Sequence, residues 1–173
     1  NLCKADGIHT KSALGANSIL AVSLANLREY AASRSFPLYQ YIHFINKQVS
    51  KLNKEPILLA SMLNILNGGV LADNKIDFQE FMLLHLGLNI FTSALRCGVE
   101  IFNELKNFLK SENLITSVGD EGGFAPQLAT AEEAIELILK AIKASGYEAG
   151  KDVFVCLDPA SSEFFNENKY ILQ

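Results

Sequence analysis

Apolar residues recur at helical spacing through the first fifty positions of the chain. Between residues 17 and 33 they fall roughly every three positions with many alanines between them, at Ile19, Val22, Leu24, Leu27 and Tyr30. This periodicity predicts a helix. Pro37 can open a second helix over residues 37–47, because the first amides of a helix need no intrahelical partner. The chain is therefore expected to begin as an all-helical segment.

Short apolar runs of a different kind follow after residue 55. Residues 56–66 are rich in Ile and Leu and stop at Asn67-Gly68-Gly69, which is typical of a buried strand. A second strand is predicted within residues 76–86. A third is predicted over residues 153–157, with Asp158 at its end.

Two amphipathic segments separate the second and third predicted strands. Residues 92–110 carry one apolar face, and Thr92 or Ser93 is the expected cap of that helix. The next helix begins at Thr130 with a capping box that ends in Glu133, in which hydroxyl and carboxylate accept from free backbone amides. Gly146 suits its C-terminal cap.

The predicted order is strand, strand, helix, helix, strand. Helices placed between buried strands indicate an α/β fold, either an open sheet or a barrel. In barrels the polar residues at the carboxyl ends of strands are usually the working ones. Asn67, Glu80 and Asp158 are expected near such ends, and Glu121 in a long loop.

Composition narrows the class of protein. The chain has 173 residues, of which 49% are hydrophobic and 20% charged, so a real core is expected and disorder is not. A net charge of −4, without a Lys/Arg cluster, argues against nucleic acid and against an anionic membrane surface. We expect no signal peptide, and the most apolar stretch, residues 56–72, is too short and too polar to span a bilayer.

The three cysteines, Cys3, Cys97 and Cys156, are odd in number and far apart. Without paired spacing they predict reduced thiols, neither a disulfide framework nor a zinc site, and hence a cytoplasmic protein. Each is expected to be a buried apolar filler.

A glycine-rich turn, VGDEGGFAP at residues 118–126, holds two adjacent carboxylates, Asp120 and Glu121. Its glycines allow backbone angles closed to other residues, and Pro126 prevents continuation as a helix. Such a turn either presents a carboxylate to a ligand or is an ordinary loop with solvated acids. The residues of the turn alone leave both interpretations open.

Five motifs in order along the chain resemble the enolase family. They are KSALGANSILAVSLA at residues 11–25, MLNILNGG at 62–69, DFQEFM at 77–82, VGDEGGFAP at 118–126 and LDPASSEF at 157–164. The resemblance implies a small α+β domain followed by an atypical α/β barrel that begins strand, strand, helix, helix. Residues 1–50 would then close the small domain, and residues 55–173 would form the first part of a partial barrel.

The resemblance also implies an activity, the interconversion of 2-phosphoglycerate and phosphoenolpyruvate in glycolysis. It implies Mg²⁺ as cofactor, and a homodimer as the usual assembly. Glu121 matches the family's general acid, which protonates the leaving hydroxide, and Glu80 its partner carboxylate, which also contacts substrate. Gln79 resembles a substrate-binding hydrogen-bond donor, and Asp158 the first carboxylate of the metal site. Alternatives are a helix N-cap for Asp158 and an edge-strand surface charge for Glu80.

The chain departs from the family pattern in three respects. Leu71 stands where the family carries a substrate-contacting histidine, and His85 stands where proline is usual. We expect His85 to be a packed or surface imidazole, not a catalytic one. The family's catalytic lysine, further metal carboxylates and phosphate-binding groups would lie beyond residue 173, and its flexible active-site loop before residue 1.

These departures leave two functions of different classes open. The chain is either a piece of an enolase that is inactive alone, or a non-catalytic paralogue used as a binding or structural protein. Leu71 favours the second. A phosphate-binding module on the two Gly-Gly turns is disfavoured, because neither turn has a Walker-type lysine.

Overall fold

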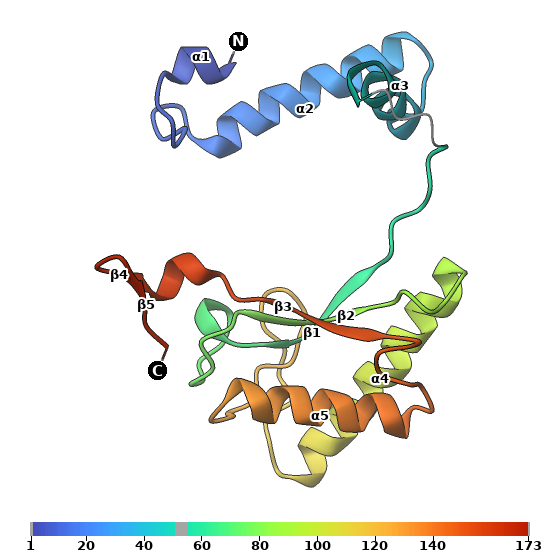
Figure 1. The fold of residues 1–173 in the computed structure, drawn as a ribbon, viewed down its shortest axis with the longest axis vertical. Helices are drawn as coiled ribbons and strands as arrows, with labels where there is room; N and C mark the ends of the chain where they lie inside the picture. Colours follow the sequence, from blue (N-terminus) through green and yellow to red (C-terminus); the bar gives the residue numbers. More distant parts are fainter. Residues whose placement is uncertain (1, 51–54, 173) are drawn as a thin grey trace. The chain divides into compact units, whose positions relative to one another are not determined.

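The computed structural model describes residues 2–50 and 55–172, and the chain divides into two compact units, Asn1–Ile57 and Leu58–Gln173 (Figure 1). Within the described residues, every helix is too short or too polar to cross a bilayer.

The first unit is helical, as predicted. It contains α1 (Leu2–Asp6), α2 (Ala16–Ser33) and α3 (Leu38–Ser50), so the third helix runs to residue 50, past the predicted end at 47. The rings of Tyr30 and Tyr41 stack with centroids 4.8 Å apart and join α2 to α3.

The second unit is built on a sheet of three strands, β1 (Met62–Asn67), β2 (Glu80–Leu84) and β3 (Phe154–Asp158). Their order is β1-β2-β3, and β2 is antiparallel to both neighbours. The three predicted strands are confirmed, although the first begins at residue 62 and not at 56. A short hairpin of β4 (Phe165–Asn166) and β5 (Lys169–Tyr170) follows the one-turn helix η2 (Ser161–Phe164).

Two helices, α4 (Phe91–Ser111) and α5 (Ala131–Ala144), pack on one another and lie on the same side of the sheet (Figure 1). Each turns one apolar stripe inward, as its periodicity predicts. The large buried side chains of the resulting core are Ile65, Leu66, Phe81, Leu83, Ile101, Leu105, Leu109, Phe124, Ile138, Ile142 and Val153.

The ends of α5 follow the local sequence closely. Thr130 Oγ1 accepts from the Glu133 amide at 3.2 Å, and Glu133 Oε2 accepts from the Ala129 amide at 2.8 Å, one residue before the N-cap amide that a capping box normally uses. At the other end Gly146 has φ 82°, and Tyr147 N donates to Ile142 O at 3.2 Å. That pattern is a Schellman motif, which satisfies the last free carbonyls.

The cap predicted for α4 is wrong. The helix begins one residue earlier, at Phe91, and its N-cap Ile90 makes no side-chain capping bond. The start of α4 is therefore formed without a side-chain cap.

Thr130→Ala is expected to lower the free energy of unfolding by about 1 kcal/mol, because the first turn of α5 loses a hydrogen-bond acceptor. Urea unfolding followed by circular dichroism measures this. Thr92→Ala is the matched control, since Thr92 lies in the first turn of α4 and is not its N-cap. An equal loss in both variants would contradict the capping role of Thr130.

The cysteines are all free, as predicted. Burial raises the pKa of Cys97, inside the core, to about 11. Cys156 is half-buried, but Cys3 is exposed, so the prediction of a buried filler is wrong for Cys3. The short helix α1 that carries Cys3 buries only Asp6, which explains the exposure.

His85, at the end of β2, is packed inside the protein and only 3% exposed. Its Nδ1 lies 3.4 Å from Ser61 Oγ and 3.5 Å from Ser61 O, and its Nε2 has no partner among the described residues. Burial lowers the pKa of His85 below its usual 6.5, against a smaller opposing effect of the Ser61 backbone hydrogen bond. The folded protein therefore favours the neutral imidazole.

This burial predicts a loss of stability in mild acid. The unfolded chain binds a proton on His85 at higher pH than the folded one, so stability is complete above pH 6.5 and falls as pH drops below it. His85→Leu should lose less stability between pH 7.5 and 5.5 than the wild type, as read from urea midpoints. His9→Leu, at an exposed position, is the control. Identical pH dependence of wild type and His85→Leu would show that His85 is not the sensitive group.

Candidate functional site

One edge of the sheet gathers polar side chains from all three strands. Because β2 runs antiparallel to its neighbours, its first residue, Glu80, lies beside the last residues of β1 and β3, Asn67 and Asp158. The expectation that Glu80 lies near a carboxyl-terminal strand end is therefore wrong. The antiparallel direction of β2 nevertheless brings it to the same edge as the two carboxyl ends.

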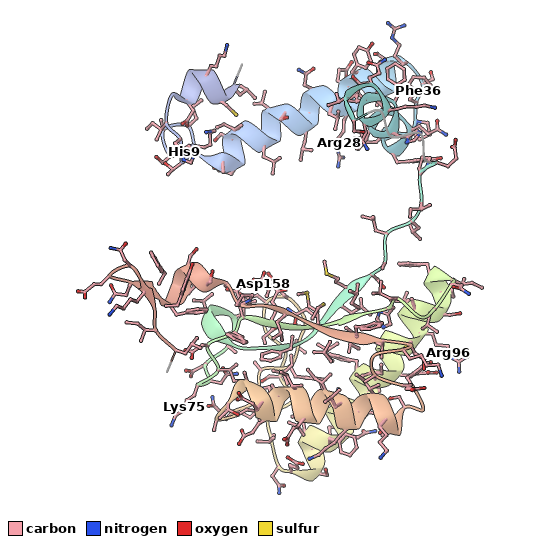
Figure 2. The ribbon with its side chains drawn as sticks, in the orientation of Figure 1. His9, Arg28, Phe36, Lys75, Arg96 and Asp158 are labelled. Carbon is pink, nitrogen blue, oxygen red and sulfur yellow. The ribbon has the colours of Figure 1, made fainter. Side chains whose placement is uncertain are left out.

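These side chains lie on the face of the sheet away from the helices. Phe81 and Leu83 are buried in the core, so Glu80 and Met82 point to the opposite face. Residues directly opposite in a ladder share a face, which places Asp158 there with Glu80. Figure 2 shows Asp158 on the side of the sheet turned away from α5. Glu80 is half-buried on the central strand, so the edge-strand alternative is wrong.

A β-bulge adds two asparagines to this face. In a regular strand Asn64 and Asn67 would point to opposite sides, but the register shifts between Asn64 and Leu66. Asn64 then pairs with Met82, and Asn67 with Glu80, on one face. From the sequence, Asn67 was expected near a strand end but had no assigned role, and Asn64 was not singled out. Two asparagines inside an apolar strand were the available signal.

The glycine-rich turn, residues 118–126, is held in place beside these asparagines. The turn closes through Gly119 N to Gly123 O at 2.8 Å and Gly122 N to Gly119 O at 3.0 Å, with Asp120 and Glu121 at its tip. Phe124 continues as a short parallel partner of β1, and its ring stacks on Phe102 of α4 at 4.2 Å. The turn is therefore held from both the sheet and the helix.

Three carboxyl groups predicted for the site come together. A hydrogen bond between the carboxyls of Glu80 and Glu121 raises the pKa of Glu80 to about 7, helped by burial and by the negative charges of Glu121 and Asp158. Asn64 Nδ2 donates to Glu121 Oε2 at 3.4 Å. The raised pKa belongs to Glu80, the residue that the family resemblance makes the partner carboxylate of the general acid. The pair is able to hold one proton near neutral pH.

Gln79 and Leu71 lie next to this cluster. The Gln79 main chain bridges the strands, since its amide donates to Asp158 O at 3.1 Å and its carbonyl accepts from Gly68 N at 3.0 Å. Leu71 ends the one-turn helix η1 (Gly69–Leu71) and is half-buried. Its side chain brings neither charge nor a hydrogen bond to the site.

Asp158 is the candidate metal ligand. It is exposed, and its Oδ1 accepts from the Ala160 amide at 2.9 Å in a local turn. The N-cap of η2 is Ala160, without a side-chain capping bond, so the N-cap alternative for Asp158 is wrong. A carboxylate oxygen is the donor that Mg²⁺ prefers, so Asp158 fits that ion as one ligand. No group of three His, Cys, Asp or Glu residues in the described part of the chain is arranged to hold a metal, so the described residues offer only part of a coordination shell.

Two protein-family models match the chain. "Enolase, C-terminal TIM barrel domain" matches residues 55–173, and "Enolase, N-terminal domain" matches residues 1–42. The chain belongs to the enolase family. The three-stranded sheet with α4 and α5 is accordingly part of an enolase-type α/β barrel, and α1, α2 and the start of α3 lie in the part that matches the enolase N-terminal domain. The enolase domains point to a family of lyases.

Proposed function

We propose that this chain is part of a Mg²⁺-dependent phosphopyruvate hydratase that interconverts 2-phosphoglycerate and phosphoenolpyruvate in glycolysis. The observation that supports it most is the carboxyl cluster of Glu80, Glu121 and Asp158 at one edge of the sheet. Residues 1–50 would then close the N-terminal domain, and residues 55–173 would begin the barrel. A cytoplasmic homodimer is the state that the family resemblance favours.

The dehydration step requires a proton for the departing hydroxide. A carboxylic acid serves only if it still holds its proton near neutral pH, and a pKa close to 7 meets that requirement. The hydrogen-bonded Glu80–Glu121 pair holds such a proton. In this proposal Glu121, at the tip of a turn, delivers it to the substrate, while Glu80 is the partner that supplies it. Gln79 lies beside Glu80 as a donor to the substrate.

The proton removed at the start of the reaction lies next to the substrate carboxylate, so negative charge accumulates there. Mg²⁺, when bound, would supply the positive charge that stabilises it. Asp158 would be one of the residues that hold the ion. Its Oδ1 bond to the Ala160 amide fixes the direction of the carboxylate at the sheet edge.

A non-catalytic paralogue is the second candidate, and Leu71 is the observation that favours it. An apolar side chain at this position lacks the hydrogen bond that the family's histidine makes with the substrate. We also propose that this chain alone is inactive, because the family's base and remaining ligands would lie outside residues 1–173. A coupled assay of phosphoenolpyruvate formation should show no turnover by the isolated chain, and turnover would overturn that proposal.

Asp158→Ala is expected to weaken Mg²⁺ binding by the full-length protein by about tenfold or more, because a carboxylate ligand is lost. Isothermal titration with Mg²⁺ alone measures this. Asp120→Ala is the matched control, since it removes the same charge from the exposed tip of the neighbouring turn. Unchanged affinity in Asp158→Ala would remove this residue from the ligands. Turnover of the full-length wild type then separates the hydratase from the paralogue.

A further inference from the structure

Asn67 Nδ2 donates to the main chain of the turn, at Gly123 O, whereas Asn64 of the same strand bonds to the side chain of Glu121. The bulge in β1 turns the Asn64 side chain to the face that bears Glu80, and Asn64 Nδ2 donates to Glu121 Oε2 at 3.4 Å. Glu121 itself is exposed at the tip of a turn between glycines. The side chain of an exposed glutamate can rotate about several bonds. A hydrogen bond from a fixed strand to its carboxylate limits these rotations.

The orientation of the Asn64 amide is constrained from its other end. Its Oδ1 is buried and has no hydrogen-bond partner in the described structure. A Cβ on Gly123 would lie only 2.7 Å from this oxygen, so the amide is packed directly against the Gly123 main chain. An unsatisfied buried oxygen normally costs about 1–3 kcal/mol, and such groups need a reason to persist. The hydrogen bond from Asn64 Nδ2 to Glu121 is a reason for the unpartnered Asn64 oxygen to be kept.

We propose that Asn64 is a positioning residue that holds the carboxylate of Glu121 over the polar edge of the sheet, against Glu80. Its purpose rests on the proposed function, but the geometry it imposes can be measured without turnover. Failure of the hydratase assay and failure of this proposal are therefore separate results.

Asn64→Leu tests the proposal, because leucine has a similar volume but cannot donate a hydrogen bond. We expect the urea midpoint to be kept or raised, since the unpartnered oxygen is removed. The order parameter of the Glu121 side-chain methylene groups, from ¹³C relaxation of this chain, should fall clearly, because the carboxylate loses its anchor on β1. Asn103→Leu, at an exposed position on α4, is the matched control and should leave that value unchanged. An unchanged order parameter in a folded Asn64→Leu protein would overturn the proposal.

Exchanging the amide of residue 64 with the carboxylate of residue 121 tests whether the lost hydrogen bond can be restored. Asn64→Asp alone places two carboxylates against each other and should loosen the turn at pH 9. The double variant Asn64→Asp/Glu121→Gln restores one amide and one carboxylate with donor and acceptor exchanged. Recovery of the Glu121-position order parameter in the double variant supports the direct bond, and no recovery counts against it.

A third measurement leaves Asn64 itself unchanged, so its result does not depend on whether the Asn64 variants fold. The side-chain ¹H–¹⁵N resonances of Asn64 should move upfield when Glu121 is replaced by glutamine at pH 9, because a charge-assisted bond is lost. The Asn103 side-chain resonances should not move. No shift at Asn64 would show that its amide does not bind the Glu121 carboxylate.

Discussion

Gly123→Ala is expected to lower the free energy of unfolding by about 2–3 kcal/mol and to displace the turn that carries Glu121. A Cβ at residue 123 would lie 2.6 Å from Asn67 Oδ1, 2.7 Å from Asn64 Oδ1 and 3.0 Å from the Leu66 amide nitrogen. Asn67 is completely buried, and the Leu66 main chain belongs to β1, so none of these neighbours is free to move aside. The turn itself must shift, and the Glu80–Glu121 bond is lost with it.

Urea unfolding gives the change in stability, and a ¹³C titration of the Glu80 carboxyl reports whether Glu121 has moved. Gly122→Ala is the matched control. Gly122 has φ 88°, but a Cβ there would meet nothing within 4 Å, so the cost is backbone strain alone, about 1 kcal/mol. Equal losses in the two variants would mean that contact with the asparagines does not constrain the turn.

The second large effect is the titration of Glu80. In the metal-free chain, with a chelator present, the Glu80 carboxyl should titrate near pH 7, far above its ordinary value of 4.5. The main causes are the hydrogen bond with the Glu121 carboxyl and then burial, both of which favour the protonated form. A ¹³C-detected titration that gave a midpoint near 4.5 would show that the two carboxyls do not share a proton.

The raised pKa of Glu80 also makes the free energy of unfolding depend on pH. The folded protein binds this proton more tightly than the unfolded chain, so the contribution is fully present below pH 4.5 and is lost as pH rises through 7. Glu80→Gln, which mimics the protonated acid, should therefore be more stable than wild type by about 2 kcal/mol at pH 9 and nearly equal to it at pH 4.5. Glu136→Gln, on the exposed face of α5, should show no such pH dependence. A constant difference between Glu80→Gln and wild type at both pH values would contradict the linkage.

Local features of the fold were predictable because they depend on neighbouring residues. The Thr130 cap and the Gly146 terminus follow from hydrogen bonds that span three to five positions. Helical periodicity likewise identified α2, α4 and α5 to within one or two residues at most ends. The cap predicted for α4 is wrong because the helix begins at Phe91, before both Thr92 and Ser93, and its N-cap is Ile90.

The candidate site was predictable only as a set of motifs. Similarity to a family singled out Glu80, Glu121 and Asp158, and the structure brings their carboxyls together. The similarity to the family did not single out Asn64, because the direction of its side chain depends on a β-bulge. It also did not show which carboxyl has the raised pKa, because that depends on burial and on charges brought together by folding.

The amino-acid sequence by itself determined the helices α2 to α5, both ends of α5, the approximate positions of the strands and the family to which the chain belongs. Only the tertiary structure decided that Glu80 opens an antiparallel central strand, that Asn64 and Asn67 share its face, and that His85 is buried with no partner for Nε2 among residues 2–50 and 55–172. The physical reason is the range of the interactions. Helical turns and caps close over a few residues, whereas strand register, bulges and proton sharing are set by groups 13 (Asn67 to Glu80) to 78 (Glu80 to Asp158) positions apart along the chain.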